Sequence, residues 1–163
     1  MKRVLVSAAL AAGLIGCAVS APTSAPAPAL DPKAEAQARE VVGPFLTAVK
    51  NNEPDAARKM TDLPWYAAAT DNVIKDGEAL AAHLNKRLSH IDPEKVSSRV
   101  VEVVPYSAFR DTVKNEGIRK NLDEVLSKDD LVVRMAPESE VPYVFVRIRD
   151  GKAKVIGFGR LMS

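Results

Sequence analysis

Two histidines and one cysteine are the side chains in this sequence that are best suited to binding a metal or forming a covalent bond. His83 and His90 are seven residues apart and could share one face of a helix. Metal sites on helices usually take ligands three or four residues apart, and no third ligand is evident, so we predict no metal and interpret both as partly exposed helix residues. The sequence has no G-x-S-x-G motif and no Gly-rich phosphate loop, so it predicts no cofactor.

Cys17 is the only cysteine, and the residues before it follow the pattern of a signal peptide. Lys2 and Arg3 precede an apolar run from Val4 to Ile15. This run is well below the roughly 20 residues that a membrane-spanning helix needs. We therefore expect it to target the chain for export rather than to span a membrane.

The residues Leu14-Ile15-Gly16-Cys17 resemble the bacterial lipobox. The resemblance implies removal of residues 1–16 and a lipid on Cys17, which becomes the first mature residue and binds the membrane through its acyl chains. Ala18 follows the cysteine, which implies an outer membrane, facing the periplasm, in a two-membrane bacterium. The alternative is an ordinary secretory signal with a chance cysteine, cleaved near the sequence CAVSA.

The segment after the cysteine is rich in proline, alanine and serine and has no apolar periodicity. Proline favours extended polyproline geometry, so we interpret residues 17–32, which include the lipidated Cys17, as a tether. Residues 33–163 are then a single domain, without a cysteine and therefore without a disulfide. A structured N-terminal strand is the alternative for the tether.

The net charge of the whole chain is +2, but Lys2 and Arg3 account for the excess. Without these two residues, basic and acidic side chains are equal in number, at 21 each. A neutral domain has no overall attraction for a polyanion, so we predict no nucleic-acid partner.

Apolar spacing predicts helices in the first half of the domain. An amphipathic helix covers residues 35–50, with a kink or a break at Gly43-Pro44. A short helix begins at Pro54, residues 63–70 are extended, and Asp76 caps a helix that runs to about residue 90.

The next segment is rich in β-branched residues, so residues 95–106 are predicted to form a strand that Pro105 ends. Residues 107–130 have helical spacing, with Ser107 as a cap and Gly117 weakening the middle. Whether this stretch is one helix or two is left open.

Three strands are predicted at the C-terminus, over residues 130–136, 141–149 and 152–160. Asp150-Gly151 is a strong signal for a two-residue hairpin turn, which sets the register of the last two strands. The expected pairs are Arg149 with Lys152, Ile148 with Ala153, Arg147 with Lys154, Val146 with Val155, Phe145 with Ile156, Val144 with Gly157 and Tyr143 with Phe158. One face then packs against the core and contains Val144, Val146, Ile148, Ala153 and Val155.

The opposite face of this hairpin carries Tyr143, Phe145, Ile156 and Phe158, and its tip is basic. Like charges across a ladder repel each other, so either solvent and nearby carboxylates offset them or an anion does. We therefore keep two readings of the tip: a solvated surface, or a contact for an anionic ligand, lipid headgroup or acidic polymer. The residues concerned are Arg147, Arg149, Lys152 and Lys154.

The order of elements over residues 35–160, helices followed by strands that end in VRIRDGKAKVIGF, is similar to the nuclear-transport-factor-like (cystatin-like) α+β superfamily. The resemblance implies an α+β fold with N-terminal helices packed on a curved, mainly antiparallel sheet and a C-terminal three-stranded meander. The helical stretch near residues 107–128 departs from the minimal pattern of that superfamily. Its members include exported domains without known catalysis, binders of small apolar ligands, and isomerases.

If the domain were isomerase-like, a carboxylate and a tyrosine or histidine would meet inside the sheet. Asp71 would transfer the proton and a tyrosine would donate a hydrogen bond to an enolate. Trp65 and Tyr66 are alternatively a packing plug at the mouth of the sheet. The candidate catalytic residues are Tyr66, Asp71, His83 and Tyr143.

Taken together, the sequence predicts a lipid-anchored, exported α+β domain of the bacterial cell envelope that acts as a non-catalytic binding module. One alternative is a small-ligand or isomerase-like pocket in the curved sheet. Another is a structural envelope protein that meets an anionic polymer or lipid through its basic hairpin tip. An envelope protein is also a possible partner, and the sequence predicts no oligomeric state.

Overall fold

The computed structural model of the chain describes residues 30–161. The predicted signal peptide, Cys17 and most of the predicted tether lie outside the described residues. Within them, no helix is long and apolar enough to cross a membrane. The elements, in order, are α1 (Pro32–Lys50), α2 (Pro54–Lys59), β1 (Thr61–Ala67), β2 (Asn72–Ile74), α3 (Gly77–Leu88), the 3-10 turn η1 (Pro93–Lys95), β3 (Val100–Pro105), α4 (Tyr106–Arg110), α5 (Glu116–Val125), β4 (Leu131–Met135), β5 (Tyr143–Arg149) and β6 (Lys152–Gly159).

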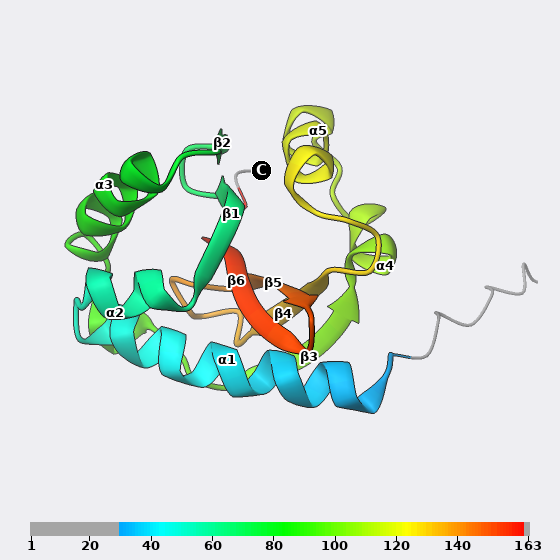
Figure 1. Cartoon of the computed structure of the whole chain (residues 1–163), viewed down its shortest axis with the longest axis horizontal. Coiled ribbons are helices and arrows are strands. Elements are labelled where there is room, and N and C mark those ends of the chain that lie inside the picture. Colours follow the sequence, from blue (N-terminus) through cyan, green and yellow to red (C-terminus); the bar gives the residue numbers. More distant parts are fainter. Residues whose placement is uncertain (1–29, 162–163) are drawn as a thin grey trace, which may run out of the picture.

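The strands form one six-stranded sheet in the order β2-β1-β6-β5-β4-β3. Every neighbouring pair is antiparallel except β1 and β6, which run parallel. Helix α1 runs beneath the sheet in Figure 1, with α3 on the left and with α4 and α5 on the right. The predicted α+β class, with helices on a mainly antiparallel sheet and a C-terminal meander, is confirmed.

Helix α1 is continuous across Gly43-Pro44, so of the two predicted alternatives, a kink or a break, the break is absent. Asp31 caps its first turn by accepting a hydrogen bond from the backbone N–H of Lys33. Pro44 is exposed, whereas Val42, Phe45 and Leu46 are buried. The backbone bond that the proline removes therefore lies on the solvent side, where water replaces it, and burial of the opposite face holds the helix together.

Helix α3 begins where the sequence predicts. Asp76 accepts hydrogen bonds from the backbone N–H groups of Glu78 and Ala79. These two bonds, that to Ala79 first, lower the pKa of the Asp76 carboxyl. The buried side of the helix is formed by Leu80, Leu84 and Leu88.

The stretch after β3 contains two helices, α4 and α5, which answers the question that the sequence leaves open. Asn115 caps α5 by accepting hydrogen bonds from the N–H groups of Gly117 and Ile118. The prediction that Ser107 is a cap was wrong. Ser107 lies inside α4, and its N–H donates to the carbonyl of Lys128. Gly117 lies in the first turn of α5, where it does not interrupt the helix.

The Asp150-Gly151 turn is confirmed, with positive φ values of 51° and 71°. The four predicted pairs nearest the turn form, but beyond Val146 and Val155 a bulge shifts the register by one residue. Phe145 consequently pairs with Gly157 rather than with Ile156. The predicted register was therefore wrong for the three pairs farthest from the turn.

Close approach of a third strand explains where the register shifts. Tyr66 in β1 pairs with Gly157, and a Cβ built on Gly157 would lie 2.7 Å from the Tyr66 carbonyl oxygen. Only a glycine fits there without a shift of the backbone. The bulge also turns Phe158 to the face opposite the one predicted, where it packs against Phe45 and Trp65.

Two hydrophobic cores result, one on each face of the sheet. The first lies between the sheet and helices α1, α2 and α3. Its centre is an aromatic cluster of Phe45, Trp65 and Phe158 with ring centroids 5.3–6.4 Å apart. The second lies under α4 and α5, and Tyr66, Phe145 and Phe109 meet there. Neighbours in β1 thus serve different cores, since Trp65 faces the first and Tyr66 the second.

Candidate functional site

Tyr66 and Asp71, two of the four candidate catalytic residues, are hydrogen-bonded to each other. The Tyr66 hydroxyl donates to Asp71 Oδ1 at 2.8 Å, across the turn between β1 and β2. Asp71 has a positive φ of 46°, and its carbonyl accepts a hydrogen bond from the side chain of Asn121 in α5. The Tyr66–Asp71 hydrogen bond thus connects the two ends of the β1–β2 turn, and the Asn121 hydrogen bond connects this turn to α5.

The surroundings of this pair favour a structural role. Tyr66 is fully buried, and burial, followed by the bond to Asp71, raises the pKa of its hydroxyl. The phenol therefore stays protonated and is already used as a donor to Asp71. Nor are the other two candidates joined to this pair by a hydrogen bond.

A second buried tyrosine is bound in the same way, and the sequence analysis missed it. The Tyr106 hydroxyl donates to Asp123 Oδ1 at 2.8 Å, and Arg110 donates to both oxygens of that carboxylate, each at 2.7 Å. The guanidinium, which is the largest cause, lowers the pKa of Asp123. This three-residue contact fastens α4 to α5, and its partners, 13 and 17 residues apart, have no short-range sequence signal.

Tyr143 lies on the second core rather than with Tyr66 and Asp71. Its ring packs against Phe109 with centroids 5.2 Å apart, and it is only partly buried. Together with Leu161 it lines two hollows of about 420 and 530 Å³. The first hollow also contains Val101, Met135, Pro137, Pro142, Arg134 and Arg160, and the second Phe109, Thr112, Val113, Lys114, Asn115 and Ile118.

His83 lies on α3 and lines a hollow of about 340 Å³ whose lining includes none of the other three candidates. Burial, then the nearby charges of Arg87 and Lys86, lower the pKa of its imidazole. His90 lines the same hollow, but it follows the end of α3 and is exposed, so the interpretation of both histidines as partly exposed helix residues is correct only for His83. Among residues 30–161, no group of three or more His, Cys, Asp or Glu side chains could hold a metal ion.

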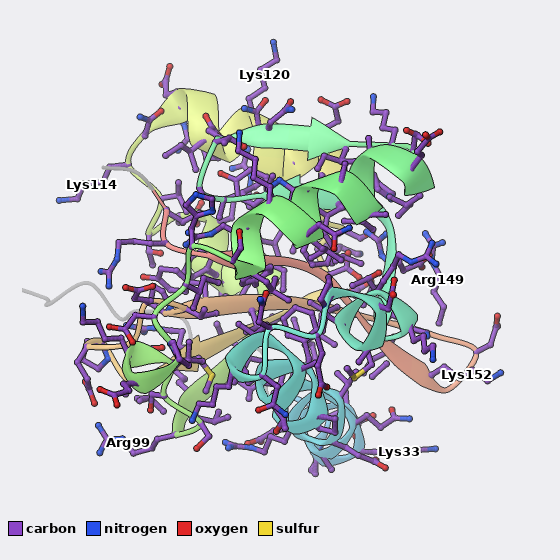
Figure 2. All side chains as sticks on the ribbon, turned by 90° about the vertical axis from the view of Figure 1, so that its left-hand side faces the viewer. Lys33, Arg99, Lys114, Lys120, Arg149 and Lys152 are labelled. Carbon is purple, nitrogen blue, oxygen red and sulfur yellow. The ribbon has the colours of Figure 1, made fainter. Side chains whose placement is uncertain are left out.

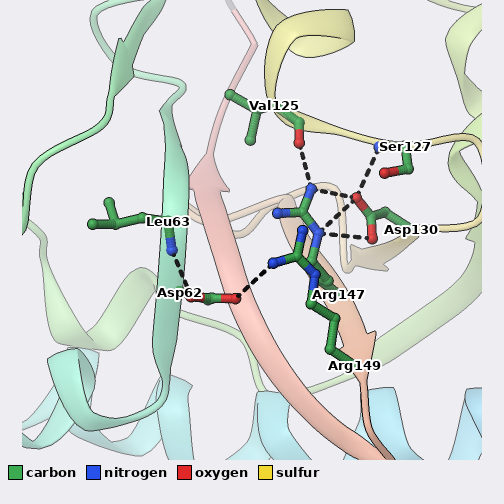
Figure 3. A network of polar contacts seen from close by, with 7 residues as sticks. All are labelled: Asp62, Leu63, Val125, Ser127, Asp130, Arg147 and Arg149. Carbon is green, nitrogen blue, oxygen red and sulfur yellow. Dashed lines mark hydrogen bonds and ion pairs between the residues drawn. The ribbon is translucent and has the colours of Figure 1, made fainter.

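The prediction of a basic hairpin tip was wrong for Arg147, which is 4% exposed. Figure 3 shows its guanidinium donating to the Asp130 carboxylate, at 2.7 Å in the shortest contact, and to the carbonyl of Val125 at the end of α5. Asp130 also accepts a hydrogen bond from the N–H of Ser127. Because the α5–β4 loop covers this part of β5, Arg147 is unavailable to an external anion.

The other three basic residues of the tip differ in how far they are engaged. Lys154 donates to the carbonyl of Lys59 at 2.6 Å, and Arg149 lies 4.0 Å from the Asp62 carboxylate. Arg149 and Lys152 project outward at the edge of the molecule (Figure 2). Lys152 has no hydrogen bond or ion pair with any described side chain. The four predicted cations therefore do not form one anion site.

Comparison with known proteins yields no relative for this chain. No family model matches it, and no match was found among curated proteins or among solved structures.

Proposed function

We propose that this chain is a lipid-anchored interaction module of the bacterial cell envelope. The observation that carries the proposal is the N-terminal sequence, in which a basic start and a short apolar run lead to Leu14-Ile15-Gly16-Cys17. A proline-rich stretch then connects Cys17 to the folded part, whose first helix begins at Pro32. Acylation of the thiol would hold the domain at a membrane surface, since two or more acyl chains anchor stably.

The placement of the candidate catalytic groups supports binding rather than catalysis. The hydroxyl of Tyr66 and the carboxylate of Asp71 are hydrogen-bonded to each other, and the tyrosine is buried. Tyr66 packs against Phe145, and Phe145 against Phe109, on the face of the sheet that carries Tyr66 and where the isomerase-like alternative needs a substrate. A packed aromatic cluster stabilises a domain and offers no room for a ligand.

The surface that best fits a binding role surrounds Tyr143. Two adjacent hollows share Tyr143 and Leu161, most of their lining residues are apolar, and Val101, which lines the first, is 55% exposed. Lys114, Arg134 and Arg160 line them, and no carboxylate is among their described lining residues. Arg134 is already paired with Glu102 at 2.7 Å, so Lys114 and Arg160 supply the charge for a partner. Charge complementarity therefore favours a protein partner that presents an apolar segment flanked by acidic residues.

The anchor is tested by metabolic labelling with radioactive palmitate in a bacterial host. The wild-type chain should incorporate label, and globomycin, which blocks the lipoprotein signal peptidase, should cause the unprocessed form to accumulate. Cys17→Ala should abolish labelling, whereas the control Ala18→Ser should retain it. Unlabelled wild-type chain, or label that persists in Cys17→Ala, contradicts the proposal.

The binding surface is tested by photocrosslinking in cells, with a photoreactive residue at Val101 and, as a control on α3, at Glu78. Both positions are exposed and lie on different parts of the molecule. We expect a discrete protein adduct from Val101 that Lys114→Glu weakens, because the partner's carboxylates are then repelled. Equal adducts from both positions, or insensitivity to Lys114→Glu, contradicts this assignment.

A further inference from the structure

We propose that the hollow between α3 and the β1–β2 turn binds a phosphate group. The hollow is lined by Ala69, Thr70, His83, Lys86, Arg87 and His90, and is called the α3 hollow below. It lies on the side of the molecule that faces the viewer in Figure 2, where α3 is in front. The site is independent of the lipid anchor and of the surface around Tyr143.

The sequence spacing brings the basic groups of the α3 hollow together. Lys86 and Arg87 follow His83 by three and four residues, so the three side chains lie on one side of α3. His90 follows the end of the helix and adds a second imidazole. Thr70, from the β1–β2 turn, supplies a hydroxyl whose one contact within the described chain is a long one, 3.4 Å to the Ala67 carbonyl.

The cations of the hollow have no protein counter-charge in the part of the chain that the structure describes. Neither Lys86 nor Arg87 is in an ion pair there, whereas Arg39, Arg110 and Arg134 each contact a carboxylate within 2.8 Å. The hollow has no acidic lining residue among those described. Adjacent cations beside a half-buried imidazole repel each other, and a bound anion would relieve that repulsion.

The hydrogen bonding of His90 leaves one ring nitrogen for a ligand. Its Nδ1 lies 2.7 Å from the carbonyl oxygen of Lys86, which can only accept, so we assign the hydrogen of the ring to Nδ1. Nε2 is then the nitrogen without a hydrogen in the neutral ring. It can accept a hydrogen bond from the P–OH group of a monoprotonated phosphate.

The number and kind of donors favour phosphate over a carboxylate. The fork of Arg87, the ammonium of Lys86 and the hydroxyl of Thr70 together offer more hydrogen bonds than the two oxygens of a carboxylate need. The hollow, of about 340 Å³, has room for a phosphate group together with part of the compound that carries it. The phosphate could belong to a soluble compound or to a phospholipid headgroup, and the experiment below separates these sources.

Basic residues near a helix C-terminus also stabilise the helix dipole without any ligand. Helix α2 provides the comparison, because Arg58 and Lys59 are adjacent basic residues in its last turn, are exposed and are absent from the α3 hollow. The double variant Arg58→Gln/Lys59→Gln therefore matches Lys86→Gln/Arg87→Gln in charge and in helix position.

The test measures the melting temperature of the full chain in detergent, followed by fluorescence of Trp65, with increasing inorganic phosphate or with sodium chloride at equal ionic strength. We expect a saturable rise with phosphate only. Loss of one charge-assisted hydrogen bond should weaken the apparent affinity for phosphate about tenfold. Lys86→Gln/Arg87→Gln removes both cations and should therefore lose the phosphate-dependent rise in melting temperature. Arg58→Gln/Lys59→Gln should keep it.

A second arm uses vesicles of phosphatidylglycerol and of phosphatidylcholine, and compares binding by the same two double variants. A lipid headgroup is the source if the chain prefers phosphatidylglycerol, if only Lys86→Gln/Arg87→Gln removes this preference, and if inorganic phosphate has no effect on the melting temperature. An effect of inorganic phosphate alone identifies a soluble phosphate. No effect in either arm overturns the proposal, as does an equal effect of chloride.

If Lys86→Gln/Arg87→Gln does not fold, NMR of the wild-type histidine rings gives the same decision. Phosphate should shift the ring signals of His83 and His90 saturably, with little change at residues far from the α3 hollow. Unchanged ring signals in the presence of phosphate overturn the site.

Discussion

Arg147 in β5 and Asp130, the residue before β4, form a buried ion pair with side chains only 5% and 7% exposed. The guanidinium donates twice to the carboxylate through Nε, at 3.2 Å, and once through Nη2, at 2.7 Å. Its Nη1 has no hydrogen-bond partner among the described residues. The pair fixes the α5–β4 loop over the sheet, and each partner depends on the other for its charge to be tolerated there.

Removing one member of this pair should be strongly destabilising. We expect Arg147→Met to lower the free energy of unfolding by about 3–5 kcal/mol, because it leaves the Asp130 carboxylate buried and uncompensated. Urea unfolding followed by the fluorescence of the buried Trp65 measures the change. Arg149→Met is the control and should cost at most about 1 kcal/mol, because that arginine is exposed. Equal effects of the two substitutions would show that burial of the pair is not what matters.

Gly157 and Gly43 should respond differently to substitution by alanine. At Gly157 the new Cβ would meet the Tyr66 carbonyl oxygen at 2.7 Å, so Gly157→Ala should cost about 1–3 kcal/mol in the free energy of unfolding. At Gly43, in an exposed part of α1, nothing but its chain neighbours lies within 4 Å. The gain of about 0.5–1 kcal/mol that alanine brings to a helix is opposed there by contact of its Cβ with the ring of Pro44, so Gly43→Ala should be close to neutral. Thermal unfolding of both variants tests this. A neutral Gly157→Ala would disprove the close approach of β1 to β6.

The two candidate catalytic tyrosines can be compared by removing one oxygen from each. Tyr66→Phe deletes the donor to Asp71 and should lower the free energy of unfolding by about 0.5–1.5 kcal/mol, or more because the carboxylate then lacks its partner. Tyr143→Phe should be close to neutral, since the Tyr143 hydroxyl has no hydrogen bond within residues 30–161. Urea unfolding measures both, and a larger loss for Tyr143→Phe would refute the structural role of the Tyr66 hydroxyl.

The lowered pKa of His83 predicts a loss of stability on mild acidification. Its unfolded-state pKa is 6.5, and burial together with Arg87 and Lys86 lowers the folded-state value. Between these two values the unfolded chain binds more protons, so the free energy of unfolding falls as the pH falls below about 6.5. His83→Gln should flatten this part of the profile in phosphate-free buffer. An unchanged slope in His83→Gln would assign the effect to another group.

Asp123 should produce a second loss at lower pH. Arg110 and the other contacts lower its folded-state pKa below the unfolded value of 3.8, so its contribution is present above that value and disappears as the pH falls through the folded pKa. Arg110→Gln should reduce the contribution. Acid unfolding curves of wild type and Arg110→Gln test this, and superimposable curves in the range below pH 4 would contradict it.

Local signals account for the elements that were predicted correctly. The Asp76 cap, the apolar spacing of Leu80, Leu84 and Leu88, and the Asp150-Gly151 turn each act within a few residues. Strand β2 was not predicted, because three residues are too few to show an alternating pattern. Of the candidate site, Tyr66 and Asp71 could be identified from residue type, whereas the hydrogen bond between them could not, because it depends on the conformation of the β1–β2 turn.

By itself, the sequence determined the α+β class, the C-terminal hairpin turn and the buried faces of α1 and α3, because backbone preference and apolar periodicity are properties of neighbouring residues. Only the tertiary structure decided the register beyond Val146 and the fate of Arg147. Both depend on contacts between distant parts of the chain: Tyr66 in β1 approaches Gly157, and Asp130 with the end of α5 surrounds the guanidinium. Arg147 was expected on the exposed face of a strand. It is buried instead, because the α5–β4 loop places the Asp130 carboxylate over it.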